Sequence, residues 1–320
     1  MMKLSILTPA YNAGNTLAAS VQAVASLKID GELEVIVVDD GSSDNTASIA
    51  GELGAAYPWV KFIRRENRGE SAALNTALDN ISWEPDFIAI IEADVEVRPD
   101  WLELLLPAFD DPKVMGAGGF LETAPSDPWI ARLAGYEIEG KFKSKEKETV
   151  HLTSANVLYR AEAFRIAGRF EEKLVNASLD ALFNSKLLDE GYKLIYVPDA
   201  KVIHHYKTSF FDYLKRQYAY ARYRAHLTRT NLYPADRWVG AGVFLAALFW
   251  LSILLAWKWP LLPVGLFILM IVVNTIPTVK LFMEKKDPAL ILNPLVITLR
   301  NMVVAVGIPL GMVMKKLGRY

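Results

Sequence analysis

The first 110 residues of the chain alternate between two patterns of apolar and polar positions. Short runs rich in Val, Ile and Leu are typical of buried strands, and the segments between them carry apolar residues at helical spacing. The predicted strands cover 4–8, 34–38, 60–64 and 87–91, and the predicted helices cover 15–28, 45–53 and 70–78. Repeated β-α-β units of this kind predict a parallel sheet with helices on both faces.

The alternation continues, less regularly, to about residue 208. Further strands are predicted at 114–121, 153–160 and 196–205, with helices at 161–166 and 177–190. We therefore expect an α/β fold over residues 1–208, with a Rossmann-like, mainly parallel sheet and flanking helices. In the last of these strands, alternation places Ala200, Val202 and His204 on one face.

The C-terminal part of the chain, 237–320, is far more apolar. Residues 239–257 and 259–279 are uncharged runs of 19 and 21 residues, and about 20 apolar residues cross a bilayer as a helix. We therefore expect an all-α transmembrane region with spans at about 239–257 and 259–280. A third apolar tract, 290–314, is long enough to span but contains Arg300, so spanning, re-entering and lying flat all stay open.

Aromatic and basic residues mix in segment 209–236, just before the first predicted span. This pattern predicts an amphipathic helix at the membrane surface, with rings at headgroup level and cations toward phosphates. A helix packed only on the globular domain is the alternative. Basic residues before the first span and after the second, and a start at Met1-Met2-Lys3 without the apolar core of a signal peptide, predict a cytoplasmic first domain.

Composition removes several classes of function. The formal net charge of −1 gives no reason to expect nucleic acid as a partner, and the absence of cysteine excludes disulfides, zinc–thiolate sites and cysteine nucleophiles. The sequence has neither a Gly-x-Gly-x-x-Gly turn after its first strand nor a Gly-Lys-Ser/Thr loop. Dinucleotide oxidoreductases and P-loop ATPases therefore lack their main signatures here.

Polar residues follow three of the strands that are predicted to be parallel. The first strand leads into 8–12, the second into 39–44, and the fourth into Glu92-Ala93-Asp94. Ligands of such sheets bind at the carboxyl ends of the strands. Two carboxylates two residues apart share a strand face, and Mg²⁺ or Mn²⁺ commonly sits between such acids and the phosphates of a ligand. Solvated acids and ordinary helix caps at these strand ends are the alternative.

Taken together, these pieces resemble family 2 inverting glycosyltransferases with the GT-A fold, over residues 3–225. The resemblance rests on the stretches 5–12, 37–46, 67–69 with Asn75, and 92–94. With its predicted spans, the chain is also similar to polyprenyl-phosphate sugar transferases and to a reduced cellulose-synthase-like architecture. It departs from the family pattern in having Glu92 for the usual aspartate and Leu179 before Asp180 for the usual glutamate. The Gln-x-x-Arg-Trp motif of processive synthases is not met, because Tyr220 stands three residues after Gln217.

The resemblance implies a role for each candidate residue. Asp94 would hold Mn²⁺ or Mg²⁺, His204 would contact the metal or the diphosphate, and Glu92 would contact the ribose, a metal-bound water or the metal itself. Asp180 would be the catalytic base, the alternative being an acid that interacts with a helix dipole. His205 is expected to be an ordinary surface histidine. The nucleotide-binding residues, with Pro9 and Tyr11 at the base and Asp39 or Asp40 accepting hydrogen bonds from the base or ribose, would be Pro9, Ala10, Tyr11, Asn12, Asp39, Asp40, Arg68, Asn75, Glu92 and Ala93.

The resulting functional hypothesis is a membrane-bound, metal-dependent hexosyltransferase. Its donor would be a nucleotide diphosphate sugar of the GDP-mannose or UDP-glucose type. Its acceptor would be a polyprenyl or dolichyl phosphate, or a lipid-linked saccharide, at the cytoplasmic face of the membrane. Two alternatives stay open, a processive polysaccharide synthase and a membrane-anchored scaffold that binds a nucleotide sugar without turnover.

Overall fold

The computed structural model describes residues 1–142, 147–172, 179–206, 209–224 and 237–317. The chain divides into two compact units. The first comprises Met1–Asp127 and Gly135–Tyr206, and the second comprises Pro128–Ala134 and Lys207–Tyr320. The predicted domain boundary at 208 lies two residues beyond Tyr206. The grouping of Pro128–Ala134 with the second unit was not foreseen.

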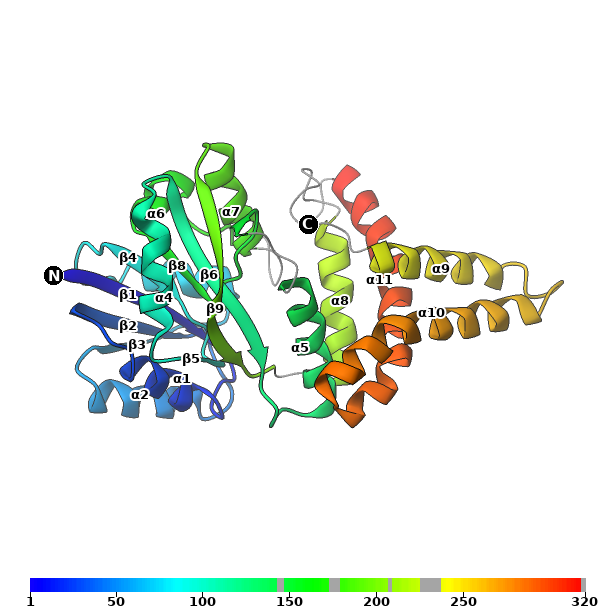
Figure 1. Ribbon diagram of the computed structural model, residues 1–320, viewed down its shortest axis with the longest axis horizontal. Helices are drawn as coiled ribbons and strands as arrows, with labels where there is room; N and C mark the ends of the chain where they lie inside the picture. Colours follow the sequence, from blue (N-terminus) through cyan, green and yellow to red (C-terminus); the bar gives the residue numbers. More distant parts are fainter. Residues whose placement is uncertain (143–146, 173–178, 207–208, 225–236, 318–320) are drawn as a thin grey trace. The chain divides into compact units, whose positions relative to one another are not determined.

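A single mixed sheet runs through the first unit (Figure 1). Its spatial order is β3-β2-β1-β4-β8-β6-β9-β5, with β7 paired to β9. The strands β1 to β4 pair in parallel as predicted, and β6 is parallel to β9, whereas β8, β5 and β7 run antiparallel to their neighbours. The strands are β1 Met2–Ala10, β2 Gly31–Asp39, β3 Val60–Arg64, β4 Phe87–Ile90, β5 Val95–Val97, β6 Val114–Thr123, β7 Glu148–Thr149, β8 Val157–Arg160 and β9 Lys193–His204.

The strand predicted at 153–160 is shorter than expected. Residues 153–156 form a turn closed by a 3.2 Å hydrogen bond from the Asn156 N–H to the Thr153 carbonyl, so β8 begins only at Val157. In β9 the prediction about alternation is confirmed, because Ala200, Val202 and His204 are all buried while the residues between them are partly exposed.

Helices cover both faces of the sheet, and each face has its own core. Side chains of β2 alternate between the two cores, with Val35 and Val37 on one side and Ile36 and Val38 on the other. Helices α1, α2 and α4 contribute to the first core, and α3, α6 and α7 contribute to the second. The helices of this unit are α1 Leu17–Ala25, α2 Thr46–Ala56, α3 Glu70–Leu78, α4 Trp101–Leu105, η1 Leu106–Asp110, α6 Glu162–Ala167 and α7 Leu179–Asp189, together with the later part of α5 Trp129–Phe142.

A buried amide joins three elements of the first core. Asn156 is fully buried, and its side chain accepts a 2.6 Å hydrogen bond from the Trp101 indole. It also donates to the carbonyls of Ala200, at 3.0 Å, and Phe120, at 3.3 Å. A buried polar group left unpaired costs about 1–3 kcal/mol. Any shift of α4, β6 or β9 that broke one of these hydrogen bonds would carry such a cost, so Asn156 helps to fix the three elements relative to one another.

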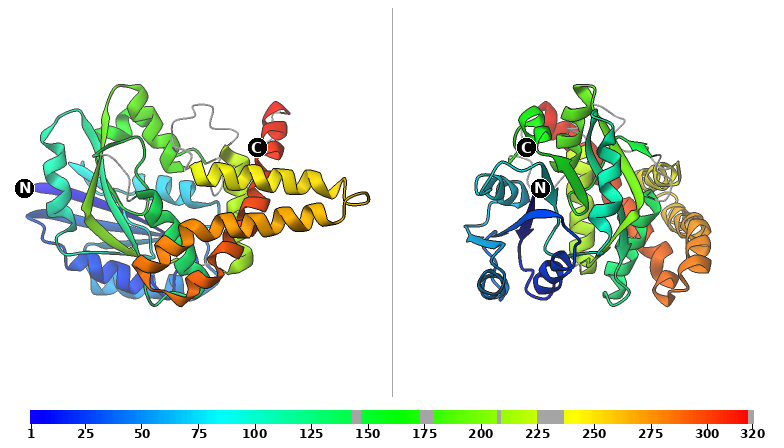
Figure 2. Two further views of the ribbon diagram at one scale, coloured as in Figure 1. Left: turned by 45° about the vertical axis from the view of Figure 1, so that its right-hand side comes forward. Right: turned by 60° about the vertical axis from the view of Figure 1, so that its left-hand side comes forward.

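The second unit is built from helices, and α9, α10 and α11 carry many exposed apolar side chains. Its helices are α8 Phe210–Arg224, α9 Arg237–Ile253, α10 Leu261–Lys285, η2 Pro288–Leu292 and α11 Asn293–Lys316. Helices α9 and α10 contact each other as an antiparallel hairpin (Figures 1 and 2). Among the described residues, two helical segments are long and apolar enough to cross a membrane, Leu261–Lys285 and Pro288–Lys316.

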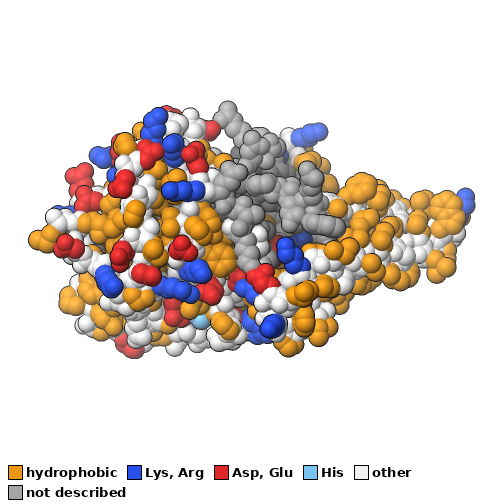
Figure 3. Space-filling view, viewed as in Figure 1, with side chains coloured by type: hydrophobic (Ala, Val, Ile, Leu, Met, Phe, Trp, Pro, Cys, Tyr) orange, Lys and Arg blue, Asp and Glu red, His pale blue; other side chains and the backbone are white. Residues whose placement is uncertain are grey.

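The first predicted span differs from its expected bounds. Helix α9 ends at Ile253 because residues 254–258 form the turns that reverse the chain, and its described apolar part, Gly240–Ile253, is shorter than a full span. On the face seen in Figure 3, the side chains along the hairpin are nevertheless mainly hydrophobic. Lys258, at the tip, is the only charged residue between Arg237 and Lys280.

His205 links three segments of the first unit. Its Nε2 lies 2.7 Å from Glu96 Oε1 on β5, and its Nδ1 lies 3.2 Å from Oδ1 of the buried Asp127. The hydrogen bond to Asp127, with a further contribution from Glu96, raises the pKa of His205 to about 9 against the opposing effect of burial. His205 is therefore a structural cation that joins the end of β9 to β5 and to the loop after β6.

We expect the stability of the fold to depend on pH through His205. Its folded pKa of about 9 lies above the ordinary 6.5, so the stabilisation is complete below about pH 6.5 and is lost as the pH rises through about 9. Thermal unfolding of the detergent-solubilised protein from pH 6 to 10, compared with His205→Gln, measures this contribution. Between pH 6 and 10, the melting temperature of the wild type should fall by more than that of the variant. An equal fall in both proteins would contradict the assignment.

Candidate active site

Glu92 and Asp94 lie on the turn between β4 and β5 and not within a strand. The Ala93 N–H donates to the Pro9 carbonyl at 3.4 Å, and the His205 N–H donates to the Asp94 carbonyl at 2.9 Å. These bonds fasten the turn to the ends of β1 and β9. The two carboxylates are thus brought together by the turn, and not by the strand alternation from which their proximity was predicted.

Three predicted metal-site residues meet at this turn. One carboxylate oxygen each of Glu92 and Asp94 and a ring nitrogen of His204 lie within 4.8 Å of one another. His204 Nε2 is 3.4 Å from Asp94 Oδ1, and the Ser154 hydroxyl donates to Glu92 Oε1 at 2.8 Å. Carboxylate oxygens are the ligands that Mg²⁺ and Mn²⁺ prefer, and the imidazole adds a nitrogen ligand. The side chains therefore fit a divalent cation.

Electrostatics at the turn favour an added positive charge. Burial raises the pKa of Glu92, and the neighbouring Asp94 carboxylate raises it further, while His204 and the Ser154 hydrogen bond act in the opposite direction. A cation would supply the positive charge that the ionised pair needs.

Asp180 stands in the first turn of α7, close enough to the cluster for its charge to act on Glu92. Its charge helps to raise the pKa of Glu92, and its Oδ2 lies 3.5 Å from His151 Nε2. Helix α7 is fixed nearby by Asn184, which accepts a hydrogen bond from the Tyr159 hydroxyl at 2.8 Å. The predicted base is therefore close to the metal-site residues, beside a histidine that the sequence analysis did not select.

Glu70 is an acid of this site that the sequence analysis missed. It is the first residue of α3, directly after Gly69, whose φ of 91° places that glycine in the left-handed region. Burial raises the pKa of Glu70 well above its usual value, and the charges of Glu92 and Asp180 add to the effect. Its buried Oε1 has no hydrogen-bond partner among the described residues. The available signal was an acid immediately after the Asn67-Arg68-Gly69 motif.

Tyr206 was also missed, although it borders the metal-site residues. Its ring centroid lies 4.0 Å from that of His204, and burial raises the pKa of its hydroxyl, with further contributions from Glu139 and Asp94. Helix α5 passes so closely that a Cβ at Gly135 would come within 2.7 Å of the Tyr206 ring. The signal was an aromatic residue two positions after His204, on the same face if the strand continued.

The ends of β2 and β3 form the other side of the candidate site. The carboxylate of Asp40 is already bonded by the loop after β3. It accepts the N–H groups of Arg68, at 3.2 Å, and Gly69, at 2.7 Å, and it pairs with Arg65 Nε at 3.2 Å. Asp39 is fully buried and accepts the Ser42 N–H at 3.0 Å through Oδ1. Its Oδ2 accepts no hydrogen bond among the described residues, and it forms an ion pair at 3.4 Å with Nε of Arg64, whose side chain is largely exposed.

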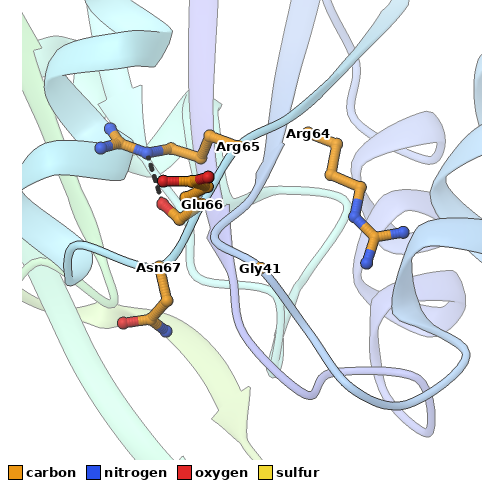
Figure 4. A pocket seen from close by; sticks show the side chains of 5 residues that line it. All are labelled: Gly41, Arg64, Arg65, Glu66 and Asn67. Atoms are coloured by element: carbon orange, nitrogen blue, oxygen red, sulfur yellow. Dashed lines mark hydrogen bonds between the residues drawn. The ribbon is translucent and has the colours of Figure 1, made fainter.

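A hollow lies at these strand ends, lined by Gly41, Arg64, Arg65, Glu66 and Asn67 (Figure 4). The two arginine side chains point to opposite sides of the loop (Figure 4). Gly41 has a φ of 74°, and a Cβ there would lie 2.8 Å from the Asn67 backbone nitrogen. The close approach of the two loops at Gly41 therefore shapes the hollow.

Several predicted nucleotide-binding residues have structural partners. Asn12 joins two loops, since its Oδ1 accepts the Ser43 N–H at 2.9 Å. The Asn75 amide bonds both the N–H and the carbonyl of Phe170, each at 3.0 Å. Arg68 Nη2 donates to Glu172 Oε2 at 2.8 Å. The remaining predicted residues lie at the end of β1 and on the β4–β5 turn, namely Pro9, Ala10, Tyr11, Glu92 and Ala93, with the Tyr11 side chain largely exposed.

Comparison with known families matches most of the chain. Glycosyl transferase family 2 matches residues 5–166, and Glycosyl transferase family group 2 matches residues 87–299. The first match contains most of β1, all of β2 and the Glu92–Asp94 turn, and the second extends through β9 and α10.

The chain also has named relatives, at low sequence identity. The chain is 27% identical over 225 residues to the pre-mycofactocin glycosyltransferase of Mycobacterium tuberculosis, covering 68% of this chain and 46% of that protein. It is 26% identical over 218 residues to glycosyltransferase AglE of Haloferax volcanii, covering 67% and 70%. The chain thus spans about half the length of the mycobacterial relative.

Two solved structures share the fold. Mannosyltransferase PcManGT from Pyrobaculum calidifontis, in complex with GDP-Man and Mn²⁺, aligns with a TM-score of 0.60 and 18% identity over 98% of this chain and 88% of that one. GalNAc-T7 with UDP, GalNAc and Mn²⁺ aligns with a TM-score of 0.53 and 15% identity over 72% and 52%. The family matches and this shared architecture lead to one conclusion. The chain belongs to glycosyl transferase family 2 and has the GT-A fold.

Proposed function

We propose that this glycosyltransferase moves a hexose from a nucleoside-diphosphate sugar to a lipid-linked acceptor, with inversion and with a divalent cation. The observation that carries the proposal is the meeting of Glu92, Asp94 and His204 at the sheet edge, with Asp180 close by. The cluster has the ligands for a cation, and the acid beside it can handle a proton. A cation is useful where a diphosphate leaves, and a proton acceptor is useful where a hydroxyl group attacks.

The donor proposal rests on the strand ends. Asp39 is buried, and one of its carboxylate oxygens accepts no hydrogen bond in the described part of the chain and pairs only with the exposed Arg64. This carboxylate would accept hydrogen bonds from the base or ribose. Pro9 and Tyr11, beside the metal-site turn, would border the base. The two fold neighbours that contain UDP or GDP-Man support a nucleotide sugar of one of these types.

The metal proposal rests on charge. Departure of a nucleoside diphosphate concentrates negative charge on its phosphates, and a Mn²⁺ or Mg²⁺ ion bound beside them would neutralise that charge. Asp94 and His204 would hold the ion, and Glu92, kept in place by Ser154, would contact it directly or through water. The Mn²⁺ in both fold neighbours supports this assignment.

The acceptor proposal rests on the second unit. Its α9–α10 hairpin presents an apolar surface of the kind that enters a bilayer, so a polyprenyl or dolichyl phosphate, or a lipid-linked saccharide, is the acceptor class that it favours. The basic residues that flank the hairpin favour a cytoplasmic catalytic unit. Transfer of one sugar is favoured over processive synthesis, because Gln217 and Tyr220 do not complete the processive motif.

Asp180 would act on the acceptor. A sugar hydroxyl must lose a proton as it attacks, and Asp180 would accept it while His151, 3.5 Å away, orients the carboxylate. A polyprenyl phosphate is already anionic, so with that acceptor Asp180 would position the lipid phosphate or a water. The dependence of the reaction on Asp180 therefore reports which acceptor is used.

Removal of the metal-site charge should abolish transfer. We expect the protein in detergent, given a polyprenyl phosphate, Mn²⁺ and GDP- or UDP-linked hexoses, to form a glycolipid detected by mass spectrometry. Asp94→Asn should lower kcat/KM by about 100-fold or more, because the variant stabilises the leaving diphosphate less well. Excess chelator should have a similar effect on the wild type.

Glu32→Gln is the matched control, because Glu32 is exposed at the opposite end of β2, and it should change kcat/KM less than about twofold. Transfer that is unaffected by Asp94→Asn and by chelator would overturn the metal assignment. Lack of transfer from every donor would overturn the proposed function.

Asp180→Asn should separate the two acceptor classes. With a lipid-linked saccharide we expect kcat to fall by about 10²–10⁴-fold, since the attacking hydroxyl loses its base. With a polyprenyl phosphate the decrease should stay below about tenfold, because no proton has to be removed. Initial rates of wild type, Asp180→Asn and Asp189→Asn, at the other end of the same helix, measure this difference. Full activity of Asp180→Asn with a hydroxyl acceptor would exclude it as the base.

A further inference from the structure

Polar and apolar residues are distributed on helix α11 in the opposite way to a helix of a soluble protein. Most buried residues of α11 are polar or small, and its exposed side is apolar. The buried residues are Asn293, Pro294, Val296, Thr298, Arg300, Asn301, Gly307 and Gly311, and the exposed ones include Ile291 and Leu292 of η2 and Leu295, Val306, Leu310 and Val313 of α11. A helix with this distribution faces lipid on one side and protein on the other.

The buried polar side chains of α11 bond to α10. Asn274 Nδ2 donates to Thr298 Oγ1 at 2.9 Å, and Asn293 Nδ2 donates to Thr278 Oγ1 at 3.0 Å. On α9, a Cβ at Gly242 would lie 2.2 Å from Asn301 Nδ2, so the Asn301 side chain packs directly on the backbone of α9 there. These contacts fix where α11 meets the hairpin.

Among the side chains that the structure describes, these contacts occupy a short stretch of each helix of the hairpin. On α9 they run from Gly242 to Trp250, whose indole donates to the Met302 carbonyl at 3.0 Å. On α10 the buried residues are Met270, Asn274 and Thr278. Eight residues of helix correspond to about 12 Å, which is the diameter of one helix. The footprint is therefore that of a helix crossing the hairpin and not running along it, as Figures 1 and 2 also show.

Helix α8 packs against α11 through two glycines. A Cβ at Gly307 would lie 2.8 Å from the Ala221 Cβ, and a Cβ at Gly311 would lie 2.2 Å from the Arg222 carbonyl oxygen. The Gly-x-x-x-Gly spacing allows the two backbones to approach closely. Helix α8 thus lies alongside the C-terminal half of α11, on roughly the opposite side from its apolar stripe.

The exposed face of α8 is incompatible with the interior of a bilayer. Lys215 and Arg216 are exposed on α8, and Lys315 and Lys316 are exposed in the last turn of α11. A charge at the centre of a bilayer costs a few kcal/mol, so the half of α11 that is joined to α8 has to stay at headgroup depth. There the four cations would meet lipid phosphates, and the apolar stripe of α11 would meet the acyl chains.

We infer that α11 does not cross the membrane and lies along its surface with α8, at the base of the α9–α10 hairpin, which is the chain's transmembrane element. The partner of the α8–α11 pair is the headgroup region of the bilayer. Lys315 and Lys316 then stay on the same side as Lys286, although α11 is long and apolar enough to span. The inference goes beyond sugar transfer and rests on insertion of the hairpin.

Single cysteines test this directly, because the chain contains none of its own. We would introduce Lys258→Cys at the hairpin tip, Leu317→Cys after α11, and Glu52→Cys on the exposed side of α2 in the catalytic unit. Sealed vesicles of either orientation would be treated with a membrane-impermeant maleimide. We expect Leu317→Cys and Glu52→Cys to react from one side at least tenfold more than from the other, and Lys258→Cys to react from the opposite side.

Reaction of Leu317→Cys from the same side as Lys258→Cys, opposite Glu52→Cys, would show that α11 spans and would overturn the inference. Reaction of all three from one side would show that the hairpin does not cross, and would also overturn it. Neither result depends on turnover, so failure here is distinct from failure of the proposed sugar transfer.

Depth gives a second, independent readout. Spin labels at Val306→Cys on α11 and Val272→Cys on α10 would both stand at exposed valines of apolar helices. We expect the label at 306 to collide with a water-soluble nickel chelate at least several times more often, relative to oxygen, than the label at 272. Equal depths would contradict a surface position for α11.

Discussion

The candidate site of the first unit brings together carboxylates that repel one another, two of them buried. Glu92 and Asp94 share one turn, and the charges of Asp180 and Glu70 reach the same place. Burial and mutual repulsion raise the pKa values of Glu70 and Glu92, so the arrangement stores an unfavourable energy that protons or a cation relieve. Much of the surrounding structure serves to hold these acids in place, from the bonds that fasten the turn to the Ser154 hydroxyl on Glu92.

Sequence pattern predicted the elements that depend on local periodicity. The parallel strands β1 to β4 and the buried face of β9 are confirmed, because each is a short apolar run with a clear period. The antiparallel half of the sheet could not be read in this way, since pairing partners such as β4 and β8 are set by long-range contacts. For the same reason the turn before β8 was assigned to the strand, although it supplies Ser154 to the site.

The candidate site shows the same division. Asp94 and His204 were selected because they end strands, and the fold brings them within 3.4 Å. Glu70 is marked in the sequence only by its position after Asn67-Arg68-Gly69, and no pattern marks His151. The packing of α3 and of the 151–152 segment brings these two residues near Asp180. Periodicity likewise could not decide the course of α11, because a surface helix and a spanning helix can have the same hydropathy. Its glycine contacts with α8 supply the missing constraint.

Binding of Mn²⁺ to the purified protein tests the metal assignment most directly, because an imidazole ligand leaves a nitrogen coupling in the pulsed EPR spectrum of the ion. If Glu92, Asp94 and His204 form the cation site, the wild type should show coupling to one imidazole nitrogen. The coupling should be lost in His204→Gln and kept in His205→Gln, whose side chain bonds Glu96 and Asp127 instead. Bound Mn²⁺ without nitrogen coupling, or coupling that persists in His204→Gln, would contradict this site.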